Sequence, residues 1–212
     1  MMVSEIFLSI QGESTYAGLP CIFVRLAGCN LECKWCDTAY ARDASEGYEM
    51  TVDDVVGEVK KFKPWLVEIT GGEPLLQADA KKLAHRLLDE DYTVLLETNG
   101  SADVGGLDER VVKIIDVKCP SSGHEGVFLM ENLDYITQQD EVKFVIGDRG
   151  DYDYAKKFME DFLREITARV LFAPVRPRIE PSELADWILK DGLKVRLQLQ
   201  LHSYIWEEEK GR

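Results

Sequence analysis

Three cysteines near the N-terminus lie close enough in sequence to hold one inorganic centre. Cys29, Cys33 and Cys36 have the spacing C-x3-C-x2-C. A structural zinc ion takes four protein ligands, usually in two separated pairs, and no obvious fourth ligand lies nearby. A [4Fe-4S] cluster normally takes four thiolates, so three cysteines would leave one iron open to bind a small molecule. The residues favour such an open cluster; a zinc site, or a disulfide plus one spare thiol, is the alternative.

The cysteines follow an apolar run, residues 21–27, that predicts a β-strand. Other unusual segments also follow predicted strands, at residues 70–74 (Thr-Gly-Gly-Glu-Pro), 97–100, 116–118 and 174–176. The carboxyl ends of parallel strands lie at one edge of a sheet, where α/β proteins place their chemistry. We therefore expect these segments to meet at one mouth.

The order of the predicted elements indicates the fold. Apolar runs predict strands at residues 3–10, 21–27, 65–70, 92–97, 111–117, 141–146, 169–172 and 194–201. Helices are predicted at residues 52–61, with Thr51 and Asp54 as a capping box, from Pro74 through Leu88, and at 152–165 and 181–189. Alternating strands and helices favour βαβ units and a parallel sheet. The units fall short of eight, so we expect an α/β fold, a partial, open TIM-like (β/α) barrel, as one domain over residues 1–212.

Composition argues against some classes of partner. The chain has 212 residues and a net charge of -14, and a strongly acidic protein is a poor candidate for binding nucleic acid or an anionic membrane. No stretch approaches the ~20 apolar residues of a membrane span, and the N-terminus lacks the features of a signal peptide. Five cysteines, three of them clustered, suit a reducing compartment. We expect a cytoplasmic protein.

The cysteine spacing, followed downstream by Gly71-Gly72-Glu73-Pro74, resembles the radical S-adenosylmethionine (SAM) superfamily. The resemblance implies a [4Fe-4S] cluster on the three cysteines, with its open iron chelated by SAM. The Gly-Gly segment would hold the methionine amino group, and Trp35 would lie beside the adenine. The residues that the resemblance assigns to SAM are Trp35, Asp37, Gly72, Asp116 and Lys118. Relatives tend to have Ser-Pro-Lys where this chain has Asp-Val-Lys, so Lys118 is a closer match than Asp116.

Further segments resemble one family in particular, the 7-carboxy-7-deazaguanine synthases of the 7-deazapurine pathway that leads to queuosine or archaeosine. They are Ile10-Gln11-Gly12-Glu13, Arg25, Cys36-Asp37-Thr38 and Gln200-Leu201-His202. The resemblance assigns substrate contacts to Ile10, Gln11, Gly12, Arg25, Thr70 and His202. Among these, Arg25 would pair with the substrate carboxylate. Thr38 would be a hydroxyl ligand of Mg²⁺.

The resemblance also implies a reaction. A radical formed from SAM would remove a hydrogen atom at C6 of 6-carboxy-5,6,7,8-tetrahydropterin. Ring contraction and loss of ammonia would give 7-carboxy-7-deazaguanine, with SAM regenerated, which makes the enzyme a carbon–nitrogen lyase. The implied partners are this small pterin, an electron donor such as flavodoxin or ferredoxin, and a second copy of the chain in a homodimer.

Two alternative functions remain open. A glycyl-radical-enzyme activating protein has the same cysteine spacing but needs a groove for a protein partner. A non-catalytic iron–sulfur or zinc protein would not respond to SAM. The tail after Tyr204, residues 206–210, differs from relatives whose C-terminus ends in the pocket, so no contacts are carried over to it.

Overall fold

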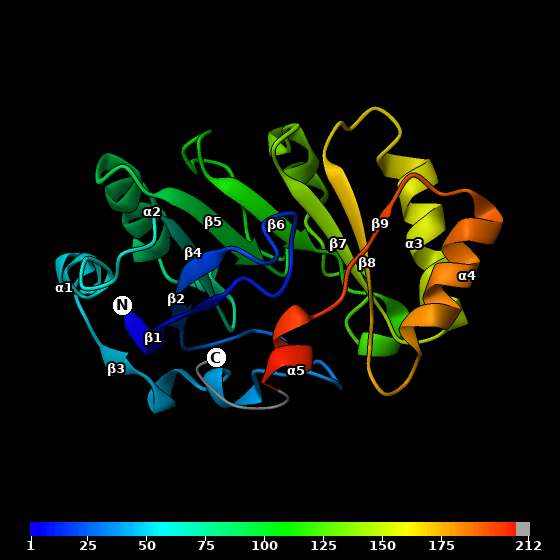
Figure 1. Cartoon of the computed structure of the whole chain (residues 1–212). Helices are drawn as coiled ribbons and strands as arrows, with labels where there is room; N and C mark the ends of the chain where they lie inside the picture. Colours follow the sequence, from blue (N-terminus) through cyan, green and yellow to red (C-terminus); the bar gives the residue numbers. More distant parts are fainter. Residues whose placement is uncertain (207–212) are drawn as a thin grey trace.

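The computed structural model describes residues 1–206, so most of the tail singled out above, residues 207–210, lies outside the described residues. Within residues 1–206, nine strands form one sheet with the order β3-β1-β2-β4-β5-β6-β7-β8-β9. The strands are β1 Met2–Ile10, β2 Pro20–Leu26, β3 Tyr48–Glu49, β4 Leu66–Gly71, β5 Thr93–Thr98, β6 Val112–Asp116, β7 Glu141–Ile146, β8 Arg169–Pro174 and β9 Arg196–Leu197. β1 is antiparallel to β2 and β3, and each pair from β2 to β9 is parallel. The curved, unclosed sheet confirms the predicted partial (β/α) barrel (Figure 1).

Helices cover the outer face of this sheet. They are α1 Val52–Val59, α2 Asp79–Asp89, α3 Arg149–Phe162 and α4 Pro181–Asp191. In Figure 1, α1 and α2 lie towards the β4 and β5 side, and α3 and α4 lie beside β7 and β8. Their buried sides form two apolar clusters with the strands. A short helix, α5 Leu201–Ile205, lies apart from them near the end of the described chain.

The inner face of the sheet changes character along the strands. A small apolar cluster occupies the amino-terminal part and consists of Cys21, Phe23, Leu66, Leu95, Val112 and Ile114, with Phe7 and Tyr16 against it. Side chains alternate between faces along a strand. Residues two or four positions after these apolar ones therefore also face inward, nearer the carboxyl ends of the strands. Inward-facing residues in this part of the sheet are Glu68 and Thr70 on β4, Glu97 on β5, Asp116 on β6 and Lys143 on β7. The mouth of the barrel is therefore polar.

Side-chain caps explain where two helices begin. Thr51 Oγ1 accepts from Asp54 N at 3.2 Å, and Asp54 Oδ2 accepts from Thr51 N at 3.1 Å. The capping box predicted for α1 is therefore confirmed. α3 begins earlier than predicted, at Arg149, because Asp148 Oδ1 accepts a hydrogen bond from Asp151 N at 3.0 Å.

The helix predicted from Pro74 is wrong in its first part. Pro74–Leu76 is a single 3-10 turn, and α2 begins only at Asp79. Gln77 between them is extended. Its Nε2 donates to Met2 O at 3.0 Å and to Ala27 O at 2.9 Å. These long-range contacts hold the residue out of the helix.

The strand predicted for residues 194–201 is also wrong over most of its length. Only β9 pairs with β8, and α5 begins at Leu201. Leu201 N donates to Gly12 O at 2.8 Å. We call residues 196–205 the C-terminal strap, because this segment leaves the sheet and joins the loop after β1.

No helix within residues 1–206 is long and apolar enough to cross a membrane.

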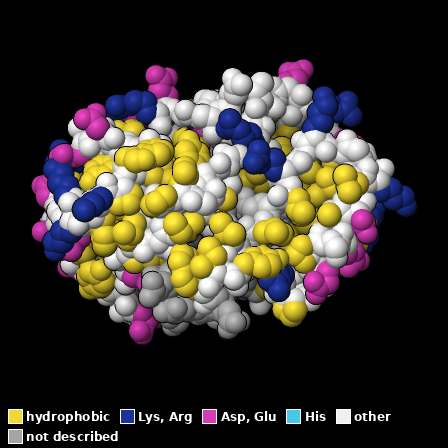
Figure 2. Space-filling model, in the orientation of Figure 1, with side chains coloured by type: hydrophobic (Ala, Val, Ile, Leu, Met, Phe, Trp, Pro, Cys, Tyr) yellow, Lys and Arg dark blue, Asp and Glu magenta, His cyan; other side chains and the backbone are white. Residues whose placement is uncertain are grey.

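Figure 2 shows hydrophobic side chains gathered over the middle of the face that carries β1, β9 and α5, with charged side chains mostly around its edge. The exposed large apolar residues on these three elements are Leu8, Leu197, Tyr204 and Ile205.

Candidate active site

The loop after β2 brings the three cysteines to the predicted edge of the sheet. Cys29, Cys33 and Cys36 are free thiols and half-buried. Burial raises the pKa of the Cys29 and Cys33 thiols, and the neighbouring thiols of the group raise both values further. The ammonium of Lys118 opposes this rise. The three side chains therefore lie within electrostatic reach of one another, as the ligands of one centre must.

Gly72 allows the end of β4 to touch the cysteine loop. A Cβ on Gly72 would lie 2.2 Å from Gly28 O and 2.8 Å from Cys29 Cβ. Next to it, Glu73 N donates to Gly28 O at 2.8 Å. Only glycine fits such a close approach of two backbones. Three thiol donors beside this glycine cradle fit a three-cysteine [4Fe-4S] cluster.

The Glu73 carboxylate joins the Gly-Gly segment to the end of β5. It is fully buried and accepts from Leu75 N at 2.9 Å, from Thr98 Oγ1 at 2.9 Å and from Asn99 N at 2.7 Å. Burial raises the pKa of Glu73, and these hydrogen bonds oppose the rise. Its side chain therefore ties two strand ends together.

Asn99 continues this tie to the cysteine loop through a closed ring of side-chain hydrogen bonds. Asn99 Nδ2 donates to Asn30 Oδ1 at 3.1 Å, and Asn30 Nδ2 donates to Ser101 Oγ at 2.8 Å. Ser101 Oγ donates to Asn99 Oδ1 at 2.6 Å. The ring fixes the orientation of the Asn99 amide, whose Nδ2 lies 4.0 Å from Cys29 Sγ.

Asp116 and Lys118, at the end of β6, present both a charge and an unused acceptor. Lys118 Nζ lies 2.8 Å from Asp116 Oδ2. Burial opposes the charge on Lys118, but Asp116 and Cys33 raise its pKa. Among the described residues, Asp116 Oδ1 is buried without a hydrogen-bond partner. A buried carboxylate oxygen needs a donor, and SAM carries hydroxyl and amino donors, so this position fits SAM.

Trp35 extends from the cysteine loop towards the segment after β8. The Arg178 guanidinium lies 5.0 Å from the centroid of the Trp35 ring. In the same segment, the Arg176 guanidinium lies 4.8 Å from the Tyr204 ring on α5. These cation–π contacts link the residue predicted to lie beside the adenine, the loop after β8 and the strap.

Lys143 on β7 lies at the centre of the mouth. Its side chain is 5% exposed, and Nζ lies 2.9 Å from Glu13 Oε2 and 4.0 Å from Asp116 Oδ2. It also forms an ion pair with Glu97, which accepts from Thr70 Oγ1 at 3.1 Å. Burial opposes the charge of Lys143, but Glu13 and Glu97 raise its pKa well above the usual value.

The loop between β1 and β2 lies along the inner face of the barrel. Gln11 donates to Glu68 on β4, and Thr15 N donates to Glu141 Oε1 on β7 at 2.9 Å. Glu13, between these two residues, reaches the β7 lysine. The loop therefore brings the predicted substrate residues Gln11 and Gly12 to the same mouth as the cysteines.

The C-terminal strap holds this loop from the other side. Gln198 Nε2 donates to Glu13 Oε2 at 2.8 Å, and Gln200 Nε2 donates to Glu13 Oε1 at 2.9 Å and to Asp37 Oδ2 at 3.2 Å. A Cβ on Gly12 would lie only 2.1 Å from His202 Nδ1. The strap therefore joins the cysteine loop and the loop after β1 across the mouth.

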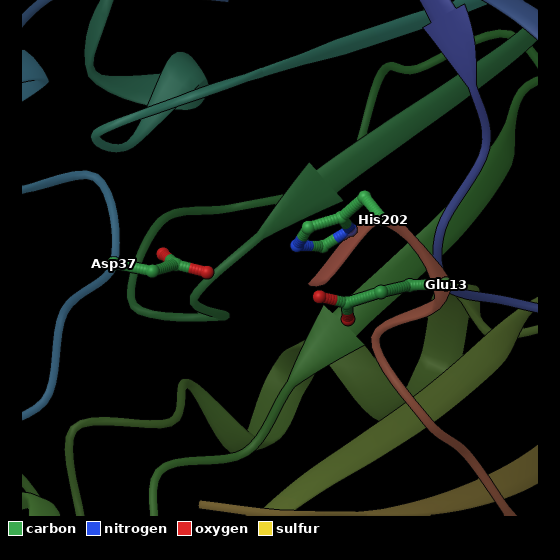
Figure 3. A group of neighbouring side chains, drawn as sticks. All are labelled: Glu13, Asp37 and His202. Carbon is green, nitrogen blue, oxygen red and sulfur yellow. The ribbon is translucent and has the colours of Figure 1, made fainter. Parts of the chain in front are cut away.

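Glu13, Asp37 and His202 point towards one another from three different segments (Figure 3). One ligand atom from each lies within 4.8 Å of the others. A cation between them would compete with Lys143 and with the strap amides for Glu13. The predicted Mg²⁺ ligand Thr38 follows Asp37, and its hydroxyl lies 3.7 Å from Cys36 Sγ. A hydroxyl and a carboxylate side by side fit a hard cation that prefers oxygen ligands.

Arg25 lies at the side of the mouth, on β2. Its Nε donates to Glu5 Oε1 at 2.8 Å, and the Tyr40 hydroxyl donates to the same oxygen at 2.7 Å. The sequence predicted a carboxylate of the substrate as its partner, and the structure gives it a carboxylate of β1. Ile10 ends β1 opposite Pro20 and is half-buried.

Sequence reasoning gave no role to several residues in the mouth or beneath it. They are Glu13, Glu68, Glu97, Lys143 and Gln198, although Glu97 begins the segment 97–100 that was expected at the mouth. A signal was available, because Glu68, Glu97 and Lys143 interrupt apolar strand runs, and charged side chains are almost never buried without a partner.

The chain matches known proteins over most of its length. Residues 23–189 match the radical SAM superfamily. The 7-carboxy-7-deazaguanine synthase of Koribacter versatilis is 46% identical, over 99% of this chain and 98% of that protein. That of Chlorobaculum tepidum is 44% identical, over 98% of this chain and 94% of that protein.

A solved structure supports the fold. The crystal structure of QueE from Escherichia coli superposes with a TM-score of 0.80 at 20% identity, over 95% of this chain and 94% of that one. The chain belongs to the radical SAM superfamily and, within it, to the family of the 7-carboxy-7-deazaguanine synthases.

Proposed function

We propose that this protein converts 6-carboxy-5,6,7,8-tetrahydropterin to 7-carboxy-7-deazaguanine with loss of ammonia. The observation that supports the proposal most directly is one connected set of charge interactions and hydrogen bonds. It runs from Cys33 through Lys118 and Asp116 to Lys143, and from there through Glu13 to the strap. The cysteines and a group of charged and polar side chains that could bind a small acid therefore lie at one mouth.

Cys29, Cys33 and Cys36 would hold the [4Fe-4S] cluster, and the residues proposed for SAM are Trp35, Asp37, Gly72, Asp116 and Lys118. When bound, the cluster and SAM together supply the radical that removes a hydrogen atom from the substrate. Lys118 would place a positive charge beside the methionine carboxylate, and Asp116 Oδ1 would accept from a SAM donor. The protein thus orients the reactants and leaves the hard chemistry to the cofactors.

The polar mouth suits a pterin. The pyrimidine edge of a pterin carries amino and ring N–H donors, and Glu13 and Glu97, which both pair with Lys143, offer acceptor oxygens. The proposed substrate residues are Ile10, Gln11, Gly12, Arg25, Thr70 and His202. Arg25 would pair with the substrate carboxylate through the guanidinium nitrogens other than the Nε that Glu5 accepts from. Thr38 would add a ligand to Mg²⁺ near the same carboxylate.

The strap has a role in excluding water. Its contacts to Glu13, Asp37 and Gly12 cover the mouth opposite the sheet. Water exclusion protects a reactive radical from side reactions. The same cover disfavours a glycyl-radical-enzyme activating protein, which needs an open groove for a protein partner.

The cellular setting is part of the proposal. A cluster that passes single electrons requires a donor protein, and flavodoxin or ferredoxin is the proposed class. We place the protein in the cytoplasm, as a single domain over residues 1–212. A homodimer is proposed through the face that carries β1, β9 and α5, where Figure 2 shows hydrophobic side chains. Exposed apolar residues of these elements include Leu197 and Ile205.

The test is an anaerobic assay of the full chain reconstituted with iron and sulfide. With reductant, SAM, Mg²⁺ and the pterin, mass spectrometry should detect the deazapurine from the wild type. Cys33→Ala should abolish both cluster and product, and Thr38→Ala should lower product sharply while the cluster stays. Cys21→Ala is the matched control, because this buried thiol lies outside the cysteine loop. SAM cleavage without a pterin product would overturn the substrate, and no cluster at all would overturn the proposal.

A further inference from the structure

Glu68 lies beneath the mouth and contacts one mouth residue directly. Its Oε2 accepts a hydrogen bond from Gln11 Nε2, and Glu68 and Gln11 are 4% and 2% exposed. The other end of the amide is bonded as well, since Gln11 Oε1 accepts from Glu13 N at 2.9 Å. The Gln11 main chain pairs with Leu19 and Gly18, both at 2.8 Å. Of these partners, Glu68 lies on the sheet and the others lie in the β1–β2 loop.

The neighbours of Glu68 in the sheet are apolar. Strand pairing places Phe23 of β2 on one side of it and Leu95 of β5 on the other. Both belong to the buried inner cluster. A carboxylate loses much of its hydration in such a row. A neutral carboxylic acid avoids this cost and still offers Gln11 an acceptor.

We propose that Glu68 is a positioning residue for substrate binding, which acts as a neutral carboxylic acid that fixes Gln11 and its loop against β4. The inference rests on the proposed function, in which Gln11 contacts the pterin. Glu68 lies below Gln11 and acts on the substrate through it.

Charged groups around Glu68 reinforce its neutral state. The titratable and charged groups that face it are Glu13 from the β1–β2 loop, Cys21 from β2, Glu97 from β5 and Lys143 from β7. Burial raises the pKa of Glu68 to about 8, with Glu97 and Glu13 adding to the rise and Lys143 opposing it. Glu13 and Glu97 already share Lys143, so an ionised Glu68 would add a further carboxylate around one ammonium.

The direction of the pH effect follows from this arrangement. As the pH rises through about 8, Glu68 gains a negative charge. That charge would draw Lys143 away from Glu13 and repel the carboxylate of the pterin. The KM for the pterin should therefore rise above this pH. The kcat should change little, because Glu68 does not touch the reacting atoms.

The experiment compares the wild type with Glu68→Gln and Glu68→Leu in the reconstituted full chain, at pH 7 and pH 9. The wild-type KM should rise about tenfold, because a group with a pKa near 8 is only about one-tenth neutral at pH 9. Glu68→Gln keeps an acceptor and stays neutral, so its KM should match the wild type at pH 7 and stay flat. Glu68→Leu leaves the buried Gln11 N–H unpaired and should raise KM about tenfold at both pH values.

The ratio of the wild-type KM to the Glu68→Gln KM cancels any titration of the pterin or the cofactors. A ratio that stays near one from pH 7 to pH 9 would overturn the inference. So would a Glu68→Gln variant that is as impaired at pH 7 as Glu68→Leu, because the charged form would then be the active one.

A second readout needs neither substrate nor cofactor. Between about pH 4.3 and 8, the unfolded chain ionises Glu68 while the folded chain keeps it neutral, so folding stability falls as pH rises. In denaturant unfolding of the apoprotein, Glu68→Gln should gain stability relative to the wild type across this range. If the difference in stability between Glu68→Gln and the wild type does not change with pH, Glu68 is not neutral in the folded protein, even if product forms. A wild type that makes no product, with this gain present, overturns the proposed function and the role in substrate binding but leaves the neutral acid standing.

Discussion

Lys143 Nζ lies 2.9 Å from the Glu13 carboxylate, which is 130 residues earlier in the chain. The pair joins β7 to the loop after β1, and Lys143 also pairs with Glu97. Its side chain is 5% exposed, so water cannot replace it. Lys143 therefore neutralises part of the negative charge that Glu13 and Glu97 bring to the mouth.

Lys143→Met should therefore destabilise the fold strongly. Removing one partner of a buried ion pair typically costs ~3–5 kcal/mol, and here it leaves Glu13 and Glu97 uncompensated. Denaturant unfolding of the apoprotein at pH 7 measures the loss, and Lys143→Arg should recover most of it.

The Lys143 effect should depend on pH in a defined direction. Burial opposes ionisation of Glu97, but Lys143 lowers its pKa below the usual value. A carboxyl with a lowered pKa contributes stability above its unfolded value, about 4.3, and loses it as pH falls through the folded value. The gap between the wild type and Lys143→Met should narrow below about pH 4. A gap that is constant with pH would mean that lost packing, not charge, causes the effect.

Asn99→Asp should lower the reduction potential of the cluster. The substitution replaces an N–H donor near Cys29 Sγ with a carboxylate, and donors to cluster sulfurs stabilise the more negative, reduced state. We expect about a tenfold smaller ratio of reduced to oxidised cluster at a fixed potential, or about 59 mV for one electron. A redox titration followed by electron paramagnetic resonance measures it. Ser101→Ala, which only loosens the ring, should shift the potential less; an unchanged potential in Asn99→Asp would contradict the expectation.

Gly12→Ala should displace the C-terminal strap. The new Cβ would lie 2.1 Å from His202 Nδ1 and 3.0 Å from its Cγ, so the loop and α5 must separate. Overpacking of this kind costs ~1–3 kcal/mol. We expect product formation to fall while the cluster still assembles. Gly57→Ala on α1 is the matched control, because its Cβ would meet nothing within 4 Å; it should stabilise the protein by about 0.5–1 kcal/mol. Full activity in Gly12→Ala would show that the strap contact is dispensable.

Thr51→Ala should remove the cap of α1 and cost about 1 kcal/mol. For a chain of this size, that is a fall in Tm of roughly 2–4 °C. Thr51→Ser keeps the hydroxyl and should behave as the wild type. Because α1 lies on the outer face of the sheet, product formation at 25 °C should not change. Calorimetry measures the change in Tm, and the product assay measures whether activity is unchanged.

Local patterns in the sequence were enough to predict much of the fold and the place of the cysteine loop at the carboxyl edge of the sheet. The cysteine spacing, the Gly-Gly turn and the Thr51 capping box each lie within a few residues. Alternation of apolar runs with helical spacing predicted the parallel sheet, because both periods are properties of a single segment. The convergence of the motifs followed from one rule about strand ends.

The tertiary structure decided the features that depend on distant segments. Most of the strand predicted at residues 194–201 is instead part of the C-terminal strap. Its backbone bonds to Gly12, and its Gln200 side-chain amide bonds to Glu13 and Asp37, in place of pairing along the sheet edge. In the sequence, Lys143 and Glu68 are recognisable only as charged residues within apolar runs. Their states arise from burial and from carboxylates that the fold brings in from other strands and loops. The sequence by itself therefore determined which chemistry this protein carries. Only the fold decided which charged side chains lie together at the mouth, because electrostatic energy depends on distance in space and on exclusion of water.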